Sequence, residues 1–448
     1  MRVPRRCSPL STDLVTTSQS ILHALLIILL CIAFRSAHSD IVVAKPYSES
    51  EQRSLTISGF SSATSGNADL KNQIAQLLRQ SGRFNINIDP VSRHTDDGDI
   101  KNKFTQWDNS DIDYVLIGKA QQMDDQSLQV DATLVKRDGQ RNLFANRYTI
   151  EEQQVNPLAR TISNEIYTSV TGKDGLLVSR FAFVSQGEIN SERRSSVYLS
   201  DRFGDDRHEV LVINAPHAII SPAFSPDGNS LIYISTESAG EYWLVTHDLA
   251  STERRKTYSA GNIISGPAWS PDGSKIAFSV HSEDAADIYT IDSQNGKLHR
   301  LTNASSMDIE PSWVDNKSLL FTSDRSGSRQ IYHTNLETAE NPTVLTKNGP
   351  GNFSPFVAPN RRGFAFVHTS RNGSHIAYQD FRSGTVRVLS SGKKDQTPAI
   401  SPDSQFVAYT DGERDNGDIG VIAIDESYQY FIRSRPNEKL AYPAWSSQ

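Results

Sequence analysis

The chain has 448 residues, of which 37% are apolar and 22% charged, and this composition excludes an intrinsically disordered protein. Its 45 basic residues against 52 acidic ones give a formal net charge of −7, which argues against a nucleic-acid-binding protein, because such proteins usually present a basic face. The only two cysteines, Cys7 and Cys31, exclude a disulfide scaffold and a cysteine-based zinc site. The length suggests two or three domains.

Residues 1–39 have the pattern of a secretory signal peptide. Arginines at the start precede a 14-residue apolar run, Ile21 to Phe34, that is broken only by His23. This run is shorter than the roughly 20 residues that a membrane-spanning helix needs. Small residues, Ala37 and Ser39, then precede Asp40 at the positions that a signal peptidase requires. We therefore expect an exported protein that does not span the membrane after cleavage; an N-terminal membrane anchor is the alternative.

Residues 40–175 are predicted to form a mixed α/β domain. Apolar residues at helical spacing predict helices over 69–80 and 157–170, the second with Pro157 in its first turn. Alternating apolar and polar residues predict five strands: 55–60, 84–88, 114–119, 128–136 and 143–150. Strands and helices alternate first and then strands follow one another, which is typical of a layered α/β fold.

Residues 176–448 contain an internal repeat. The segment Ser221-Pro-Ala-Phe-Ser-Pro-Asp-Gly228 recurs as Gly266-Pro-Ala-Trp-Ser-Pro-Asp-Gly273, and weaker copies follow. The prolines that mark the repeat are separated by 43 to 45 residues, and they are Pro222, Pro267, Pro311, Pro355, Pro398 and Pro443. Each repeat predicts four strands joined by turns, and four strands in about 44 residues is the pattern of one β-propeller blade.

The two ends of the repeat region predict how the ring closes. Three strands after residue 180 lack a preceding Pro-Ala-Trp strand, and 442–446 supply such a strand with nothing after it. The two fragments complete one blade, so five whole repeats and this composite blade predict a six-bladed propeller without a free sheet edge. A solenoid is the alternative, but it needs capping repeats at its ends.

Two sets of repeated side chains are interpreted as structural. The residues two positions after each proline are expected to pack between neighbouring blades, where large rings contribute strongly to burial; they are Phe224, Trp269, Trp313, Val357, Ile400 and Trp445. The aspartates of the Ser-Pro-Asp turns are likewise expected to stabilise those turns.

No catalytic motif is present in the sequence. There is no His-Glu-x-x-His, P-loop or Gly-x-Ser-x-Gly, and the histidines lack the spacing of metal ligands. The acidic stretch from Asp411 to Asp418 can attract Ca²⁺, but its spacing does not match an EF-hand loop, and a solvated turn is the preferred interpretation. We therefore expect no enzyme activity, no cofactor and no metal site.

The loops that lead into the Pro-Ala-Trp strands are the candidate functional surface. Six such loops converge on one mouth of the propeller channel, and they mix apolar with charged residues, as protein interfaces do. Inward-folded side chains that fill the channel are the alternative. The candidate residues are His217, Ile219, Asn262, Ile263, Ile264, Met307, Asp308, Ile309, Glu310, Phe353, Lys394, Asp395 and Tyr442.

Signal peptide, α/β domain, Ser-Pro-Asp-Gly repeats and the terminal Tyr442-Pro-Ala-Trp-Ser446 together make the chain similar to the TolB family. This resemblance implies a monomeric, non-enzymatic scaffold in the periplasm, within the Tol-Pal system that maintains the outer membrane and helps to constrict it in division. It implies that the mouth binds the lipoprotein Pal, and that other outer-membrane proteins are possible partners. It also implies that an N-terminal segment, here Asp40, Ile41, Val42 and Val43, binds the inner-membrane protein TolA.

Two other functions compete with this interpretation. A ligand- or sugar-binding propeller needs exposed aromatic side chains with polar partners, whereas the tryptophans are expected in the core. A propeller-gated peptidase needs a catalytic domain with a nucleophile elbow, and no such elbow occurs outside the repeats.

Overall fold

The computed structural model describes residues 41–43, 52–60, 67–89, 112–123, 127–137, 141–151, 154–173, 177, 179–189, 192–202, 204, 207–214, 217–236, 240–337, 341–347, 349–413 and 417–446. The expected signal peptide and Asp40 lie outside these residues. Among the helices that are described, none is both long and apolar enough to span a membrane.

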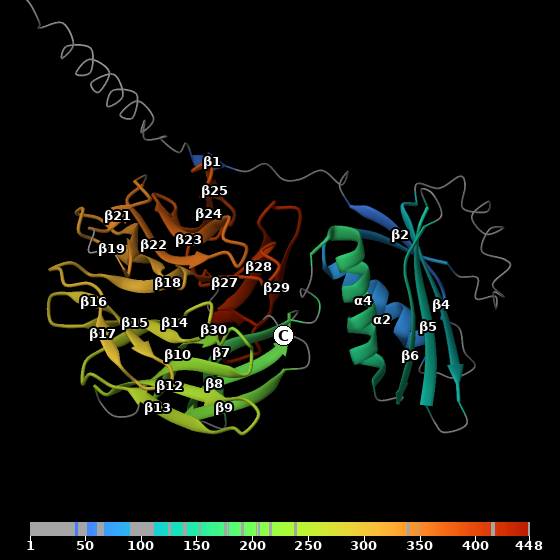
Figure 1. Cartoon of the computed structure of the whole chain (residues 1–448), viewed down its shortest axis with the longest axis horizontal. Coiled ribbons are helices and arrows are strands. Elements are labelled where there is room, and N and C mark those ends of the chain that lie inside the picture. Colours follow the sequence, from blue (N-terminus) through green and yellow to red (C-terminus); the bar gives the residue numbers. More distant parts are fainter. Residues whose placement is uncertain are drawn as a thin grey trace, which may run out of the picture. The chain divides into compact units, whose positions relative to one another are not determined.

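The N-terminal domain is a five-stranded sheet with two helices packed against it (Figure 1). Its elements are β2 (Arg53–Gly59), α2 (Asn67–Gln80), β3 (Phe84–Ile88), β4 (Tyr114–Gln122), β5 (Ser127–Lys136), β6 (Arg141–Glu151) and α4 (Val155–Thr171). The strand order is β3-β2-β4-β5-β6, with β2 parallel to both of its neighbours and the later strands antiparallel. Leu70, Ile74 and Leu78 form the buried stripe of α2, as the helical spacing predicted.

The second domain is a six-bladed propeller, which confirms the predicted fold (Figure 1). We number the blades from the one that contains β7. Blade 1 has β7 (Arg180–Ile189), β8 (Glu192–Asp201), β9 (His208–Asn214) and β30 (Glu438–Trp445). Blade 2 has β10 (Ala218–Phe224), β11 (Ser230–Thr236), β12 (Tyr242–Asp248) and β13 (Arg254–Tyr258). Blade 3 has β14 (Ile264–Trp269), β15 (Lys275–His281), β16 (Ala286–Asp292) and β17 (Leu298–Arg300).

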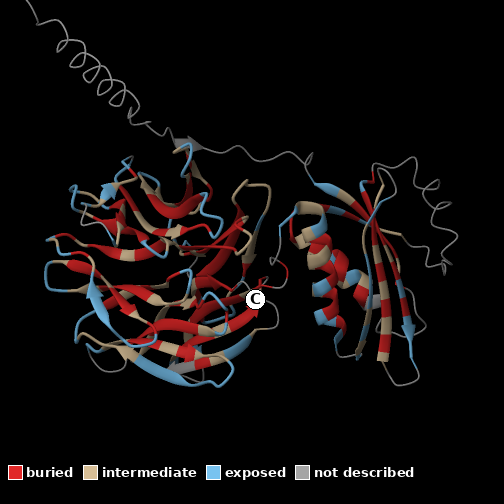
Figure 2. Ribbon diagram, viewed as in Figure 1, coloured by how far each residue is buried: buried red, intermediate tan, exposed pale blue. Residues whose placement is uncertain are grey.

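The remaining blades repeat this antiparallel order. Blade 4 has β18 (Ile309–Asp315), β19 (Ser318–Ser323), β20 (Gln330–Asn335) and β21 (Thr343–Val344). Blade 5 has β22 (Gly351–Val357), β23 (Gly363–Ser370), β24 (Gly373–Asp380) and β25 (Val386–Val388). Blade 6 has β26 (Asp395–Ile400), β27 (Phe406–Asp411), β28 (Asp418–Ala423) and β29 (Gln429–Ile432). The buried residues are most frequent on the second and third strands of the blades and rare on the outermost strands (Figure 2).

Blade 1 contains strands from both ends of the propeller sequence. β30 pairs with β7 in antiparallel register, from Glu438 opposite Gly187 to Trp445 opposite Phe181. The rings of Trp445 and Phe181 are in edge-to-face contact, with centroids 4.7 Å apart, and both side chains are buried. The pairing therefore joins the last strand of the chain to the first strand of the propeller by backbone hydrogen bonds and by a shared core.

The repeated tryptophans pack between blades, as the sequence predicted. The indole Nε1 of Trp313 in blade 4 donates to the carbonyl oxygen of Ala268 in blade 3, at 3.0 Å. Trp445 of blade 1 donates to Ala399 of blade 6 in the same way, at 3.2 Å. Each ring thus buries apolar surface and connects two neighbouring sheets through one hydrogen bond.

The Ser-Pro-Asp turns are held by local hydrogen bonds, which confirms the structural interpretation of their aspartates. The hydroxyl of Ser225 donates to Asp227 and accepts from the backbone N–H of Ser230. Equivalent bonds occur at Asp272 and Asp403. Gly228 follows with φ of 70°, a conformation that glycine adopts without a steric penalty.

The Ser-Pro-Asp end of the blades also contacts the N-terminal domain. The hydroxyl of Tyr167 in α4 donates to Asp403 at 3.1 Å, and the guanidinium of Arg83 pairs with Asp425 at 2.5 Å. Because strands alternate in direction within a blade, the loops that precede the Pro-Ala-Trp strands lie at the other end. The mouth defined by those loops is therefore separate from these contacts.

Removing Tyr442–Gln448 is expected to lower the melting temperature by more than 10 °C, because it deletes the half of β30 that contains Trp445. Replacing a buried tryptophan by alanine alone costs about 3–5 kcal/mol. Circular dichroism melting of the truncated protein measures the effect, and a control lacking only residues 447–448 should melt like the full chain. A truncated protein with unchanged melting would show that closure through β30 is dispensable.

Candidate functional site

The mouth is built on six bulged inner strands. In each blade the residue directly before the repeat proline has a positive φ, between 50° and 59°. At the same place the inner strand gains one residue relative to its neighbour, as between Ser265 and Ala268, which oppose Ser279 and Ala277. The bulge residues are Ser221, Gly266, Glu310, Ser354, Thr397 and Tyr442. This repeated bulge fixes the direction in which each mouth loop enters the channel.

The bulge also decides which predicted mouth residues reach solvent. Ile264 and Trp269 are five positions apart, yet they oppose Val280 and Ile276, which are four apart and therefore on one face of the sheet. The residue three before each proline thus turns inward with the tryptophan position. The predicted mouth residues that are buried are Ile219, Ile264, Asp308, Ile309 and Asp395.

The remaining predicted residues stay accessible at the mouth. Asn262, Ile263 and Lys394 are exposed, and Ile263 is the most exposed large apolar side chain described, at 47%. His217, Met307, Glu310, Phe353 and Tyr442 are half-buried. The accessible residues are therefore a mixture of apolar and polar side chains, and the buried residues belong to the core under the mouth loops.

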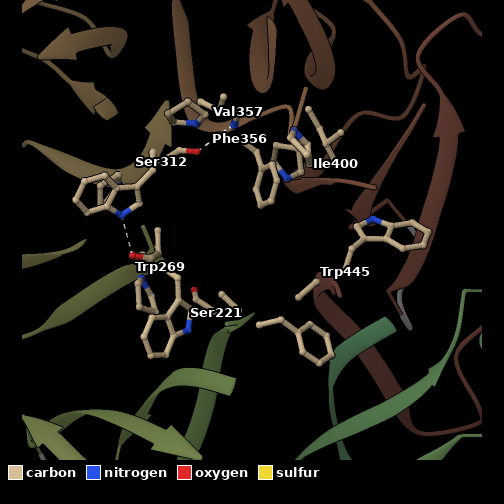
Figure 3. Close-up of a pocket in the computed structure, with 18 of the residues that line it drawn as sticks. Ser221, Trp269, Ser312, Phe356, Val357, Ile400 and Trp445 are labelled. Carbon is tan, nitrogen blue, oxygen red and sulfur yellow. Dashed lines mark hydrogen bonds between the residues drawn. The ribbon is translucent and has the colours of Figure 1, made fainter. Parts of the chain in front are cut away.

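A cavity of about 500 Å³ occupies the centre of the ring (Figure 3). It is lined by the repeat prolines and by rings such as Trp269, Phe356 and Trp445. Glu310 lies in this lining and connects two blades, because its carboxylate accepts hydrogen bonds from the Ser354 hydroxyl at 2.7 Å and from Thr322 at 3.0 Å. The channel wall is thus mainly apolar, with one tightly held acidic side chain.

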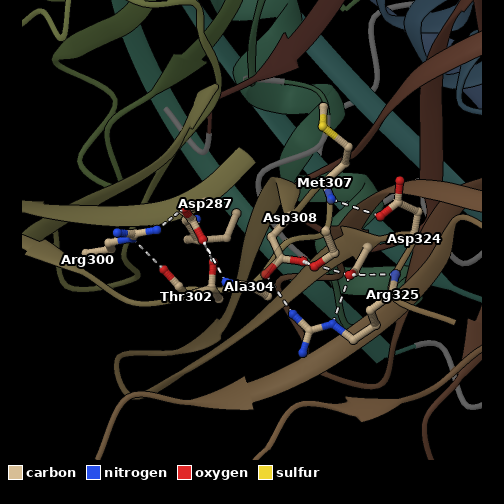
Figure 4. Close-up of polar contacts among 11 residues, drawn as sticks. Asp287, Arg300, Thr302, Ala304, Met307, Asp308, Asp324 and Arg325 are labelled. Atoms are coloured by element: carbon tan, nitrogen blue, oxygen red, sulfur yellow. Dashed lines mark hydrogen bonds and ion pairs between the residues drawn. The ribbon is translucent and has the colours of Figure 1, made fainter. Parts of the chain in front are cut away.

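Asp308 anchors the mouth loop of blade 4 through a buried ion pair (Figure 4). Its carboxylate is fully buried and lies 2.7 Å from the guanidinium of Arg325, and it accepts hydrogen bonds from Ser306 and Ser323. The backbone N–H of Met307 donates to Asp324 in the adjacent turn. These bonds satisfy a buried charge that otherwise carries a large desolvation cost.

Asp395 occupies the same position in blade 6, but without a cation. It is fully buried and accepts a hydrogen bond from Ser390, while Asp411 lies directly opposite it in β27. The blade 6 residue that corresponds to Arg325 is Glu413. No ion pair between described residues includes Asp395. Burial, together with the nearby charge of Asp411, raises the pKa of Asp395 to about 6.

The N-terminal segment forms a short strand, β1 (Ile41–Val43), which pairs in parallel with β25 of blade 5. Ile41 lies opposite Val386 and Val43 opposite Val388. Asp40, the first predicted residue of this segment, lies outside the described residues. The predicted binding segment is thus β-forming, with its backbone on the outer edge of a blade.

The turns between second and third strands also lie at the mouth, although the repeat pattern of the sequence does not mark them. Ser323 opposes Gln330 and Ser370 opposes Gly373, so these turns lie at the same end as the predicted loops. They carry Arg325, Arg329 and Arg371, all exposed. The alternation of strand direction in an antiparallel blade was the signal that could have identified them.

Among the described residues, no group of three or more histidine, cysteine, aspartate or glutamate side chains is arranged to hold a metal ion. The stretch from Asp411 to Asp418 is described only at its two ends, where Asp411 accepts from the N–H of Glu413 and Asp418 pairs with Arg433.

Comparisons with known proteins find the same family over both domains. The model of the TolB beta propeller domain matches residues 167–448, and that of the TolB amino-terminal domain matches residues 40–140. "Tol-Pal system protein TolB" of Bordetella parapertussis is 27% identical over 94% of this chain and 94% of that protein. The protein of the same name from Francisella tularensis is 27% identical over 76% of this chain and 80% of its own length. The crystal structure of TolB from Acinetobacter baumannii is 25% identical, covers 91% of this chain and 99% of that chain, and superposes with a TM-score of 0.80.

Replacing Asp395 with asparagine is expected to stabilise the protein at pH 7–8 by about 1–3 kcal/mol. The folded-state pKa near 6 lies above the ordinary value of 3.8, and one pKa unit corresponds to about 1.4 kcal/mol. The folded state therefore binds more protons between these values, so wild-type stability falls as pH rises through about 4 to 6. Urea unfolding at pH 4 and pH 7.5 measures the difference, which should nearly vanish at the lower pH.

Asp308→Asn is the matched control. It removes a charge from the equivalent position in blade 4, but there it leaves Arg325 without its buried partner. Destabilisation is expected, in contrast to Asp395→Asn. If both variants are destabilised at pH 7.5, the ionised carboxylate of Asp395 is stabilised by its surroundings in the folded protein, as that of Asp308 is by Arg325, and the expectation for Asp395→Asn is wrong.

Proposed function

The chain belongs to the TolB family, and on this basis we propose that it is an exported, non-enzymatic interaction scaffold of the Tol-Pal system in the periplasm. Its propeller mouth binds the peptidoglycan-associated lipoprotein Pal, and its N-terminal segment binds the inner-membrane protein TolA. Through these two contacts it helps to maintain the outer membrane and to constrict the envelope in cell division. The observation that carries the proposal is the family match across both domains, with relatives that are named as Tol-Pal system proteins.

The chemistry of the mouth supports a protein partner. The mouth loops carry apolar side chains that are exposed, as Ile263, or half-buried, as Met307, Phe353 and Tyr442, and they also carry exposed polar residues such as Asn262 and Lys394. An apolar centre within a polar rim is the usual composition of a protein interface. The closed ring keeps the six loops in fixed positions, so that a partner meets a preformed surface and little ordering entropy is lost on binding.

The N-terminal segment suits recognition by strand addition. A three-residue parallel pairing with β25 is a short attachment, and its hydrogen bonds come from the backbone. An extended segment of this kind can pair with the edge strand of another protein through the same backbone groups. We therefore assign the segment from Asp40 to Val43 to the TolA contact.

Replacing Ile263 with aspartate is expected to weaken Pal binding at least tenfold without a change in melting temperature. The side chain is exposed, so the substitution places a charge at the centre of the proposed interface and not in the core. Calorimetric titration with the periplasmic domain of Pal measures the affinity. Leu298→Asp is the matched control, because Leu298 is also exposed, at 39%, but lies on an outer strand away from the mouth. Equal affinity of both variants would remove the mouth assignment.

Deleting residues 40–43 from the mature protein is expected to abolish binding to the periplasmic domain of TolA and to leave Pal binding within twofold. The deletion removes β1 but no residue of the mouth loops or of the channel lining. Pull-down with purified TolA and Pal domains separates the two activities. Retained TolA binding would place that contact elsewhere on the chain.

A further inference from the structure

Exposed basic side chains gather on one sector of the mouth. The largest group belongs to blades 4, 5 and 6 and to two kinds of loop, the turns between second and third strands and the loops that enter the inner strands; the adjacent blade 1 also exposes Arg193, Arg435 and Lys439 at the mouth. We call the group in blades 4, 5 and 6 the basic arc, and its members are Arg325, Arg329, Lys347, Arg371, Lys393 and Lys394. Such a cluster is unexpected in a chain whose formal net charge is −7.

Backbone contacts make the basic arc continuous from blade to blade. The N–H of Asn352, at the start of blade 5, donates to the carbonyl of Arg329 in blade 4 at 2.8 Å. Ser374 of blade 5 forms an isolated parallel bridge with Lys394, at the entry to blade 6. The turn of one blade thus lies beside the entry loop of the next, and the cations form one surface.

Two of the six cations, Arg325 and Lys393, have an acidic partner, and the other four form no ion pair with a described residue. Arg325 pairs with Asp308, yet its side chain remains 25% exposed. Lys393 and Glu413 are 3.8 Å apart and 70% and 46% exposed, so that pair is weak. The guanidinium of Arg329 lies over the ring of Phe353, 5.9 Å from its centre, which connects the basic arc to the apolar part of the mouth.

The opposite sector of the mouth has the opposite sign. The turns between second and third strands of blades 2 and 3 expose Glu241, Glu283 and Asp284. A mouth that is acidic on one side and basic on the other fits a partner with a complementary pattern and repels one that is docked the wrong way round. A flat anionic membrane does not fit, because the acidic sector would face it together with the basic one.

We propose that the basic arc binds an acidic surface of the partner protein and orients that partner on the mouth. This inference rests on the proposed function, because it names the chemistry of the partner at the same surface. Ile263 and its apolar neighbours then supply contact area, while the basic arc supplies steering and orientation, which weaken as salt rises.

The test reverses two charges of the basic arc in the full-length mature protein. Arg371→Glu and Lys394→Glu are combined, since both side chains are exposed and neither forms an ion pair with a described residue. The control combines Lys297→Glu and Arg382→Glu, which make the same change of net charge in exposed turns at the other end of the blades. Affinity for the periplasmic domain of Pal is measured by calorimetry at 50 and 300 mM NaCl.

The arc variant is expected to bind Pal at least tenfold more weakly at 50 mM NaCl and to lose most of the salt dependence, whereas the control stays within twofold of wild type. Equal affinities of arc variant and control, with Pal still bound by wild type, overturn the inference and leave the proposed function intact.

If wild type does not bind Pal, the proposed function fails, and a second probe decides the inference alone. A fluorescent 15-residue glutamate-rich peptide should bind wild type and control but not the arc variant. Absence of binding to wild type, or equal binding to all three proteins, overturns the inference. Arc-dependent binding to phosphatidylglycerol vesicles without binding to the peptide also overturns it, because the ligand is then a membrane.

Discussion

The pairing of β30 with β7 is the contact on which the rest of the propeller depends. It brings residues about 250 positions apart in sequence into one sheet, and loop closure over such a length has a considerable entropic cost. The cost is offset by a full antiparallel ladder and by the buried contact of Trp445 with Phe181. Once the ring is closed, every inner strand has a neighbour on both sides, and the six mouth loops become one rigid surface.

The bulges transmit this rigidity to the mouth. A non-glycine residue with positive φ directly before a proline is conformationally unfavourable, so the surrounding contacts must hold it in place. At Glu310 these contacts are visible, because its carboxylate binds Ser354 of the next blade and its own N–H donates to Ser279 of the preceding one. Three blades are therefore connected through one bulge residue.

The repeat spacing was sufficient to predict the propeller, its number of blades and the packing of its tryptophans, because these follow from regular alternation. The burial of the mouth residues could not be predicted in the same way. Simple alternation from Trp269 places Ser265 inside and Ile264 outside, but the bulge adds a residue and exchanges them. A sequence shows the proline but not the extra residue, so the pattern predicts Ile264 as a contact residue, whereas in the structure Ile264 is buried and its neighbour Ile263 is exposed.

The inward-facing position three residues before each repeat proline distinguishes one half of the ring from the other. It is apolar in blades 1, 2 and 3, as Leu440, Ile219 and Ile264, and polar in blades 4, 5 and 6, as Asp308, Asn352 and Asp395. The polar half belongs to the blades of the basic arc, and two blades of the apolar half, 2 and 3, carry the exposed acids. A ring of identical blades would offer a partner six equivalent orientations. At this position buried carboxylates occur in blades 4 and 6, and each is costly unless it is satisfied or protonated. The six repeats therefore differ physically at equivalent places, and a partner that meets the mouth does not meet six equivalent blades.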